Sequence, residues 1–185
     1  MEVVMSHTLL SHTKVTNTTT TEINITSISQ SYQDLCFWFV GHDGQSVTWS
    51  NSELEIHLNG DTGGHYTHQK NYAVGTSRYG GASDNATEFN LTQLGNKDSS
   101  SNCGATVFGY IPAYTSTVNY QGHTVYIWAG AIGSSTVGAS GTTVMQYTGQ
   151  WTEETAINAI KLSYPKVGGF FAQNSTFTLY GIENS

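Results

Sequence analysis

Charged side chains are scarce in this sequence. Only 10% of its 185 residues are Asp, Glu, Lys or Arg, against roughly 25% in ordinary soluble domains. The 6 basic residues stand singly along the chain, and the formal net charge is -7. Because binding to phosphate requires clustered Lys and Arg, we expect neither nucleic acid nor an anionic membrane surface as a partner.

Cysteines and long apolar runs are also rare. Cys36 lies in an apolar run and Cys103 in a polar turn, and 2 cysteines are too few for a disulfide framework. Whether they pair is left open by the sequence. No segment approaches the roughly 20 apolar residues that span a bilayer, and the first residues lack the regions of a secretory signal peptide. We therefore expect a protein that is made in a cytoplasm and has no membrane as a partner.

Motifs for catalysis or metal binding are missing as well. The chain has no G-x-S-x-G motif, and Glu53 and Glu55 alternate with apolar residues as solvent-exposed side chains do. His57 and His65 flank a turn without a third ligand at convincing spacing. Four aspartates in polar loops lack the D-x-D-x-D-G run of a calcium loop: Asp43, Asp61, Asp84 and Asp98. We expect no catalytic residue, no metal and no cofactor.

The chain does contain many short segments of alternating apolar and polar residues. Leu54, Ile56 and Leu58 alternate with polar residues, which is the period of a half-buried strand. The segment from Asn174 to Ile182 is β-branched and aromatic, and predicts a closing strand. About nine to eleven such strands and no helix of normal length predict an all-β fold, a single-domain β-sandwich or jelly roll.

The first 14 residues are set apart from the sandwich expected over residues 15–185. They carry the apolar residues Val3, Val4, Met5, Leu9 and Leu10, separated by polar ones. Such a segment suits a first edge strand of the sandwich, an arm that docks on a neighbouring subunit, or a disordered end. The sequence leaves these alternatives open.

Three further segments have less regular patterns. Leu35 to Val40, which includes Trp38, is apolar on both alternate faces. Such a strand must be covered on both sides, by another subunit or by a loop of the same chain. The glycine-rich stretch from Ala73 to Asp84 predicts a long exposed loop, and Thr152 to Thr155 has the pattern of a helix start that fades within a turn.

Aromatic residues near the expected loops suggest another kind of site. Trp49, Tyr72, Tyr79 and Trp151 lie close to predicted turns, where their rings could stack on sugars. Aromatic side chains also dominate protein cores and subunit interfaces. Carbohydrate binding therefore stays an alternative to a structural role.

Five groups of segments follow one another in order over nearly the whole chain. They are Ile28 to Leu35 before an apolar strand, Leu58-Asn59-Gly60-Asp61 followed by Tyr66, Tyr110 to Tyr114, Trp151 before Ala156-Ile157 and Ile160-Lys161-Leu162, and Ser175 to Ile182. Together these segments resemble those of a group of small structural proteins of tailed-bacteriophage virions.

The resemblance implies a β-sandwich or jelly-roll protein of the phage particle without catalytic residues. The expected role is that of a capsid decoration (cement) protein, which binds the outer capsid surface and stabilises it. Its expected partners are the major capsid protein and copies of itself, as a homotrimer, on a virion assembled in the bacterial host. Candidate residues for the subunit or capsid interface are Val3, Val4, Met5, Leu9, Leu10 and Trp38. The alternatives are a tail-fibre or receptor-binding module of the virion and a carbohydrate-binding β-sandwich module.

Overall fold

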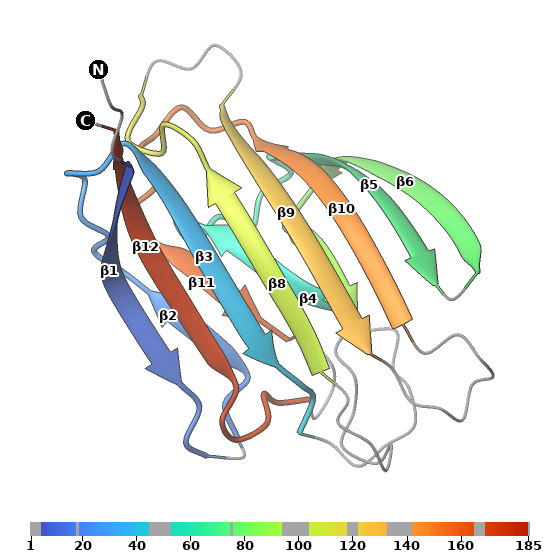
Figure 1. Cartoon of the computed structure of the whole chain (residues 1–185). Coiled ribbons are helices and arrows are strands. Elements are labelled where there is room, and N and C mark those ends of the chain that lie inside the picture. Colours follow the sequence, from blue (N-terminus) through green and yellow to red (C-terminus); the bar gives the residue numbers. More distant parts are fainter. Residues whose placement is uncertain are drawn as a thin grey trace.

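The chain folds into two antiparallel β-sheets that pack face to face (Figure 1). The computed structural model describes residues 5–17, 19–44, 53–74, 76–93, 104–117, 122–132, 142–164 and 169–184. The strands are β1 (Met5–Lys14), β2 (Glu22–Ile25), β3 (Asp34–Gly41), β4 (Glu53–Leu58), β5 (Tyr66–Val74), β6 (Ser77–Ala86), β7 (Phe89–Gln93), β8 (Gly104–Ile111), β9 (His123–Ile132), β10 (Thr142–Trp151), β11 (Ile160–Ser163) and β12 (Thr176–Asn184). The predicted all-β sandwich is confirmed.

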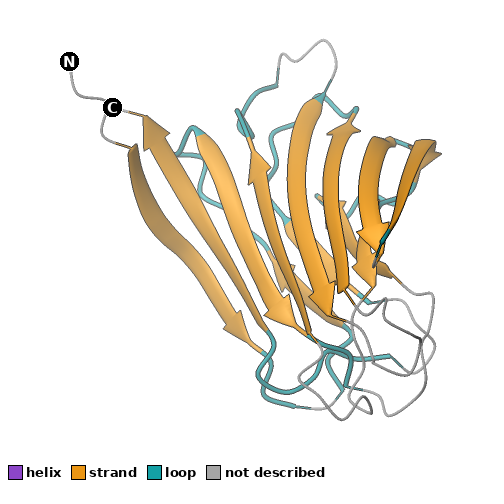
Figure 2. Ribbon diagram, turned by 45° about the vertical axis from the view of Figure 1, so that its right-hand side comes forward, coloured by secondary structure: helices purple, strands orange, loops and turns teal. Residues whose placement is uncertain are grey.

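The topology is that of a jelly roll with two added hairpins. The large sheet has 8 strands in the order β1-β12-β3-β8-β9-β10-β5-β6, and the small sheet has 4 in the order β2-β11-β4-β7. Without β5, β6, β9 and β10, consecutive strands alternate between the two sheets except at β4 and β7, which are neighbours in the small sheet, as in a jelly roll. The added strands all join the large sheet beyond β8 and double its width. Figure 2 shows the large sheet as a broad curved layer.

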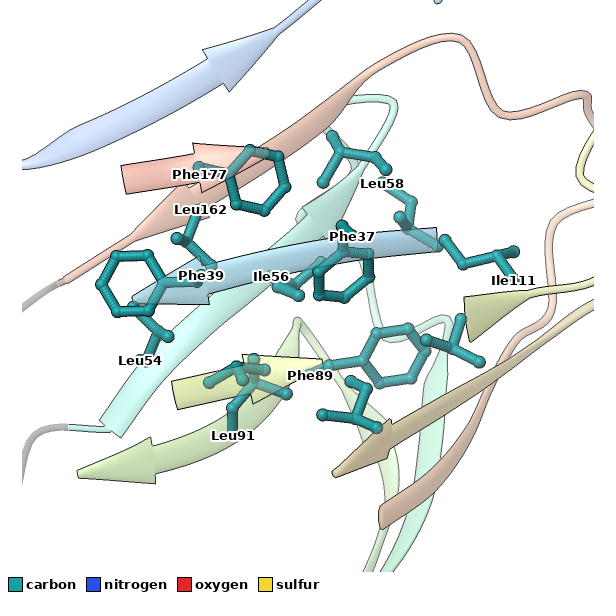
Figure 3. Packing of buried hydrophobic residues seen from close by; sticks show 14 of the residues in the cluster. Phe37, Phe39, Leu54, Ile56, Leu58, Phe89, Leu91, Ile111, Leu162 and Phe177 are labelled. Atoms are coloured by element: carbon teal, nitrogen blue, oxygen red, sulfur yellow. The ribbon is translucent and has the colours of Figure 1, made fainter. Parts of the chain in front are cut away.

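The core fills the space between the inner faces of the sheets. Phe37 and Phe39 of β3 and Phe177 of β12 meet Leu54 and Ile56 of β4 (Figure 3), and all five side chains are 0% exposed. Each inner residue is followed by an outward one, because successive side chains of a strand point to opposite faces. Full burial of each such side chain stabilises the fold by about 1.5 to 3 kcal/mol.

The N-terminal segment forms the edge of the large sheet. β1 pairs along its whole length with β12, with an irregularity between Leu9 and Ser11. The closing strand expected from Asn174 to Ile182 is β12, which lies between β1 and β3. The C-terminal strand is therefore inside the sheet, and the N-terminal strand borders it on the open side (Figure 1).

Two expectations about irregular segments differ from the structure. The stretch from Ala73 to Asp84 is not a long loop: β5 runs to Val74, and β6 begins at Ser77. Gly80 and Gly81 sit in an edge strand, where the missing side chains leave little to signal a strand. Residues 152–159 contain no helical turn, and cross back from β10 to β11 as an irregular segment.

Candidate functional site

The outer face of the large sheet carries a layer of aromatic side chains. The strand register sets Trp38 of β3 beside Phe108 of β8, and Phe108 beside Trp128 of β9. In the neighbouring row, Tyr180, Cys36, Tyr110 and Tyr126 follow one another across β12, β3, β8 and β9. We call the following six rings the aromatic face: Trp38, Phe108, Tyr110, Tyr126, Trp128 and Tyr180.

The rings of the aromatic face pack against one another. The ring centroids of Trp38 and Phe108 are 4.7 Å apart, and those of Phe108 and Trp128 are 5.5 Å apart. Tyr180 meets Trp38 edge-on at 5.5 Å, and Tyr126 lies 6.4 Å from Trp128 with an interplanar angle of 19°. Aromatic pairs at such distances attract each other beyond the burial of apolar area. The layer is therefore held in one arrangement before any partner arrives.

A large part of this layer is open to solvent. Trp38 is 38% exposed, Trp128 43% and Tyr126 37%. Three aliphatic side chains on the same face extend the surface, namely Leu9, Val40 and Val144, which are 56%, 50% and 61% exposed. Contiguous exposed apolar surface of this kind marks a site of interaction in soluble proteins.

Two apolar residues of the same face are buried. Cys36 is 1% exposed and Ile182 is 6% exposed, although both point away from the central core. Burial raises the pKa of the Cys36 thiol to about 11, so it stays protonated at neutral pH. Cys103 lies outside the described residues.

A buried carboxylate fixes one end of the aromatic face. Asp34 accepts hydrogen bonds from the Tyr110 hydroxyl at 2.6 Å and from the Ala113 backbone N–H at 2.8 Å. Burial, together with this hydrogen bond, raises the pKa of Tyr110 to about 12. Both groups therefore have a partner within the protein, which points to a positioning role for the pair.

A shallow hollow lies at the β1 side of the aromatic face. His7, Trp38 and Tyr180 line it, and its volume is about 370 Å³. Trp38 and Tyr180 form its two walls at a right angle, since their ring planes cross at 90°. The volume of the hollow is near the small end of the range for pockets that hold small ligands.

The outer faces of the two sheets differ in polarity. Among the described residues of β3, β8, β9, β10 and β12, the one charged side chain on the aromatic side is Asp34, which is 4% exposed. The outer face of the small sheet instead carries Glu22 and Asn24 of β2, Glu55 and His57 of β4, and Lys161 and Ser163 of β11. On the edge strands of the large sheet, Lys14 of β1 and Arg78 of β6 are exposed on the same side. The charged face of the small sheet suits water, and the uncharged central part of the aromatic side suits a partner.

The structure brings together some of the interface residues predicted from the sequence. Leu9 is the register partner of Tyr180, and Tyr180 contacts Trp38, so Leu9 and Trp38 share the aromatic side. Leu10 points the other way and packs against the core, because successive side chains of a strand point to opposite faces. Met5 begins β1, and Val3 and Val4 lie outside the described residues.

The aromatic residues predicted to stack on sugars do not form one surface. Trp151 is 1% exposed, and its Nε1–H donates to Asp61 Oδ2 at 2.7 Å, so its ring is closed to ligands. Tyr72 and Tyr79 stack at 5.1 Å on the hairpin of β5 and β6, and Tyr79 is 50% exposed. Trp49 lies outside the described residues.

The sequence signal for the aromatic face is alternation on both faces of a strand. Tyr126 and Trp128 alternate with the buried Val125 and Ile127, just as Trp38 alternates with buried residues in β3. Of these strands, Leu35 to Val40 alone is apolar at every position of both faces. The sequence predicts that the outer face of β3 is covered. The neighbouring aromatic rings cover part of it, and the rest is exposed to solvent.

A second cluster of polar side chains lies around the turn between β4 and β5. Asp61 accepts from Gly63 N–H at 2.8 Å and lies 2.9 Å from His65 Nδ1, while Glu153 lies 3.3 Å from the same nitrogen. Burial alone would raise the pKa of Asp61, but the hydrogen bonds from Trp151, Gly63 and His65 outweigh it and lower the pKa. The hydrogen bond with Asp61 raises the pKa of His65.

The polar cluster joins loops and is not arranged for metal binding. The imidazole and carboxylates link the β4–β5 turn to the segment after β10. In the part of the chain that the structure describes, no three His, Cys, Asp or Glu side chains are placed to hold a metal ion. Of the aspartates considered as calcium ligands, Asp43 accepts from the Tyr164 hydroxyl at 3.2 Å, and Asp98 lies outside the described residues.

Comparisons with known proteins give no family for this chain, so its function is inferred from the aromatic face. No helix within the described ranges is long and apolar enough to cross a membrane. No family model matches the chain, and no curated protein matches it significantly.

Proposed function

We propose that the chain is a non-enzymatic structural protein of a tailed-phage virion, a capsid decoration protein that binds and stabilises the outer capsid surface through its aromatic face. The observation that carries this proposal is the contrast between the two outer faces. The outer side of the large sheet carries aromatic rings and no exposed charge on β3, β8, β9, β10 and β12, with Lys14 and Arg78 on its edge strands, and the outer face of the small sheet is charged. A protein that lies on a larger particle needs one adhesive side and one solvated side.

The aromatic face has the size and rigidity that a protein interface requires. Together with Leu9 of β1 and Val144 of β10, it forms a surface that spans six strands, which at a strand spacing of about 4.8 Å corresponds to roughly 24 Å. Standard interfaces bury about 800 Å² on each partner, and Trp and Tyr are enriched among their energetic hot spots. Since the rings already pack together, docking would order few side chains.

The low charge of the chain favours a repeated arrangement on the particle. A lattice of copies concentrates charge of one sign, and this chain has few charged residues to repel one another. The major capsid protein is the proposed partner of the aromatic face. The homotrimer expected from the resemblance, and the location on the outer capsid surface, belong to the same proposal.

The copy number and location of the protein in purified particles test this proposal. A decoration protein should occur in a number comparable with that of the major capsid protein, and density for it should cover the outer capsid in cryo-electron microscopy. A low copy number with density at the tail would contradict the capsid role. That result would favour the tail-fibre or receptor-binding alternative.

Carbohydrate binding is a second candidate function, favoured by the hollow beside Trp38. A tryptophan ring with a perpendicular tyrosine wall and a nearby imidazole, His7, could hold a neutral sugar by stacking and hydrogen bonding. A glycan array would show binding that Trp38→Ala abolishes. Absence of any glycan ligand at high protein concentration would remove this candidate.

A further inference from the structure

Strand β6 is an edge strand that nothing in the described structure covers. It pairs with β5 alone, at the end of the large sheet opposite β1 (Figure 1). All six residues from Ser77 to Ala82 are exposed, so neither face of this segment is packed against the small sheet. A long open edge offers a row of unpaired N–H and C=O groups to another strand.

The hairpin register shows which backbone groups face the open edge. Val74 and Ser77 are register partners across a two-residue connection, and such a closing pair exchanges both of its hydrogen bonds. Hydrogen-bonded and non-bonded pairs then alternate along an antiparallel ladder. Ser77, Tyr79, Gly81 and Ser83 therefore bond toward β5. Arg78, Gly80 and Ala82 turn their N–H and C=O groups outward.

We infer that β6 pairs with β6 of a second copy, antiparallel and about a two-fold axis at Gly80. In that register Gly80 faces Gly80 of the second copy, and Arg78 faces Ala82. The outward groups of these residues are then matched, and six backbone hydrogen bonds can form across the axis. A two-fold contact of this kind uses the same surface on both subunits and closes after two copies.

The side chains of β6 are complementary to themselves in this register. Around Gly80 the sequence reads Ser77-Arg78-Tyr79-Gly80-Gly81-Ala82-Ser83, so each large residue faces a small one. Tyr79 faces Gly81 of the second copy, an aromatic–glycine pair of the type that stabilises glycine in sheets. No two charges of the same sign stand directly opposite each other.

The surroundings of Gly81 have room for that tyrosine ring. A Cβ atom at Gly81 would meet only the aliphatic part of the Lys70 side chain, at 3.6 Å. Tyr79 of the second copy would lie on this side of the hairpin, where Tyr79 already stacks on Tyr72 within its own chain. Its ring could then contact the Lys70 stem, and Lys and Arg stems commonly pack on apolar surface in this way.

The pairing also fits the arrangement of the aromatic face. Opposed residues of an antiparallel pair point to the same side, so the aromatic faces of both copies lie on one side of the joined sheet. The inference does not depend on capsid binding. A three-fold contact would use other surfaces of the chain. The two-fold contact alone gives assemblies of two chains, and together with a three-fold contact it gives assemblies of six, so we expect neither one chain nor three.

The mass of the full chain in solution is the first test, with Gly80→Lys as the disrupting variant. A side chain is tolerated at Gly80, since a Cβ there meets nothing closer than 3.6 Å. In the dimer the two new lysines would face each other across the axis, about 5.5 Å apart at Cα. Sedimentation velocity should show an even-numbered assembly for the natural chain, and at least a tenfold rise in its dissociation constant for the variant.

Asn71→Lys is the matched control. Asn71 is the register partner of Gly80 in β5, is exposed, and gains the same charge. Its distance from its counterpart in the dimer would be roughly 15 Å, beyond the Debye length of about 8 Å. The control should keep the assembly. A monomeric or trimeric natural chain, or equal effects of the two variants, would overturn the inference.

Disulfide trapping gives a second, independent readout. In a Cys103→Ser background, Gly80→Cys should oxidise to a covalent dimer, because a Cα separation of about 5.5 Å suits a disulfide. Asn71→Cys should not form a covalent dimer, and Cys36 should not react because it is buried. Folding of each variant is checked by its near-ultraviolet circular dichroism. Equal trapping at both positions, or none at Gly80 in a folded variant, would contradict pairing at β6.

Discussion

At the scale of single residues, two carboxylates each hold several neighbouring groups by hydrogen bonds. Asp34 holds Tyr110 and the backbone of Ala113. Asp61 holds Trp151, Gly63 and His65. Perturbed pKa values are typical of active sites but also of structural networks. Here the shifted groups have protein partners or are buried among apolar side chains, as groups in structural networks are.

Trp151→Phe tests the role of the Asp61 hydrogen bond. The substitution keeps an apolar ring but removes the Nε1–H that donates to Asp61, and we expect the free energy of unfolding to fall by about 1.5 kcal/mol at pH 7. The pKa of Asp61 is lowered in the folded state, so its stabilising contribution is lost as the pH falls through that pKa. The difference in free energy of unfolding between the natural chain and Trp151→Phe should therefore become smaller at acidic pH.

Urea denaturation of Trp151→Phe and of Trp128→Phe at several pH values makes this measurement. Trp128 is exposed, so its substitution should change stability by less than about 0.5 kcal/mol. Equal effects of the two variants would show that the Asp61 contact contributes nothing.

His68→Phe tests how burial of histidine sets the acid stability. Burial lowers the pKa of His68, and Lys70 lowers it further; its Nδ1 has no hydrogen-bond partner, and its ring stacks on Tyr147. The unfolded chain therefore binds a proton below about pH 6.5 that the folded chain does not. Stability should fall as the pH drops from 7 to 5.

The expected result for His68→Phe is a smaller loss of stability over that pH range. Part of the loss of stability should remain, because burial also lowers the pKa of His123. The exposed variant His7→Phe serves as the control and should retain the full pH dependence. An unchanged slope in His68→Phe would mean that His68 does not carry the acid sensitivity.

At the scale of elements, strands with regular alternation of apolar and polar residues can be predicted from the sequence. Edge strands and the outer faces of the sheets are harder to predict. Leu54, Ile56 and Leu58 identified β4 because one face alone is apolar. The segment from Asn174 to Ile182 identified β12. The sequence of β6 predicts a loop, because Gly80, Gly81 and their exposed neighbours carry no burial pattern. The aromatic face is built from four strands, of which only β8 and β9 are consecutive in the chain, and its assembly depends on a register that no local pattern encodes.

The two sides of β1 predict opposite effects for adjacent leucines. Leu10 packs against the core, so Leu10→Ala should lower the free energy of unfolding by about 1 to 2 kcal/mol, less than for a fully buried leucine. Leu9 is 56% exposed on the aromatic side, so Leu9→Ala should leave stability within about 0.5 kcal/mol.

Particle binding should show the reverse order for the two β1 variants. Leu9→Ala should weaken binding to capsids, and Leu10→Ala should not affect it beyond its effect on folding. Thermal unfolding and a capsid pull-down of both variants separate the two roles. Loss of stability in Leu9→Ala with none in Leu10→Ala would contradict the assigned orientation of β1.

At the scale of the whole molecule, the added hairpins explain where the interaction surfaces lie. The jelly-roll strands β1, β12, β3 and β8 supply one half of the aromatic side. The added strands β9 and β10 extend it with Tyr126, Trp128 and Val144. The added strand β6 supplies the open edge at which we infer self-association. The wide sheet thus combines one adhesive face with one pairing edge, and the charged small sheet lies on the opposite side.

Capsid binding by the double variant Trp38→Ala and Trp128→Ala tests the central claim most directly. Binding of the purified chain to capsids that lack it would be measured for the natural chain, the double variant, and Glu22→Ala on the small sheet. Truncation of hot-spot residues typically costs at least 2 kcal/mol each, which corresponds to a loss of affinity of about 30-fold or more. We predict that loss for the folded double variant and no change for Glu22→Ala. Full binding by the folded double variant would contradict attachment through the aromatic face.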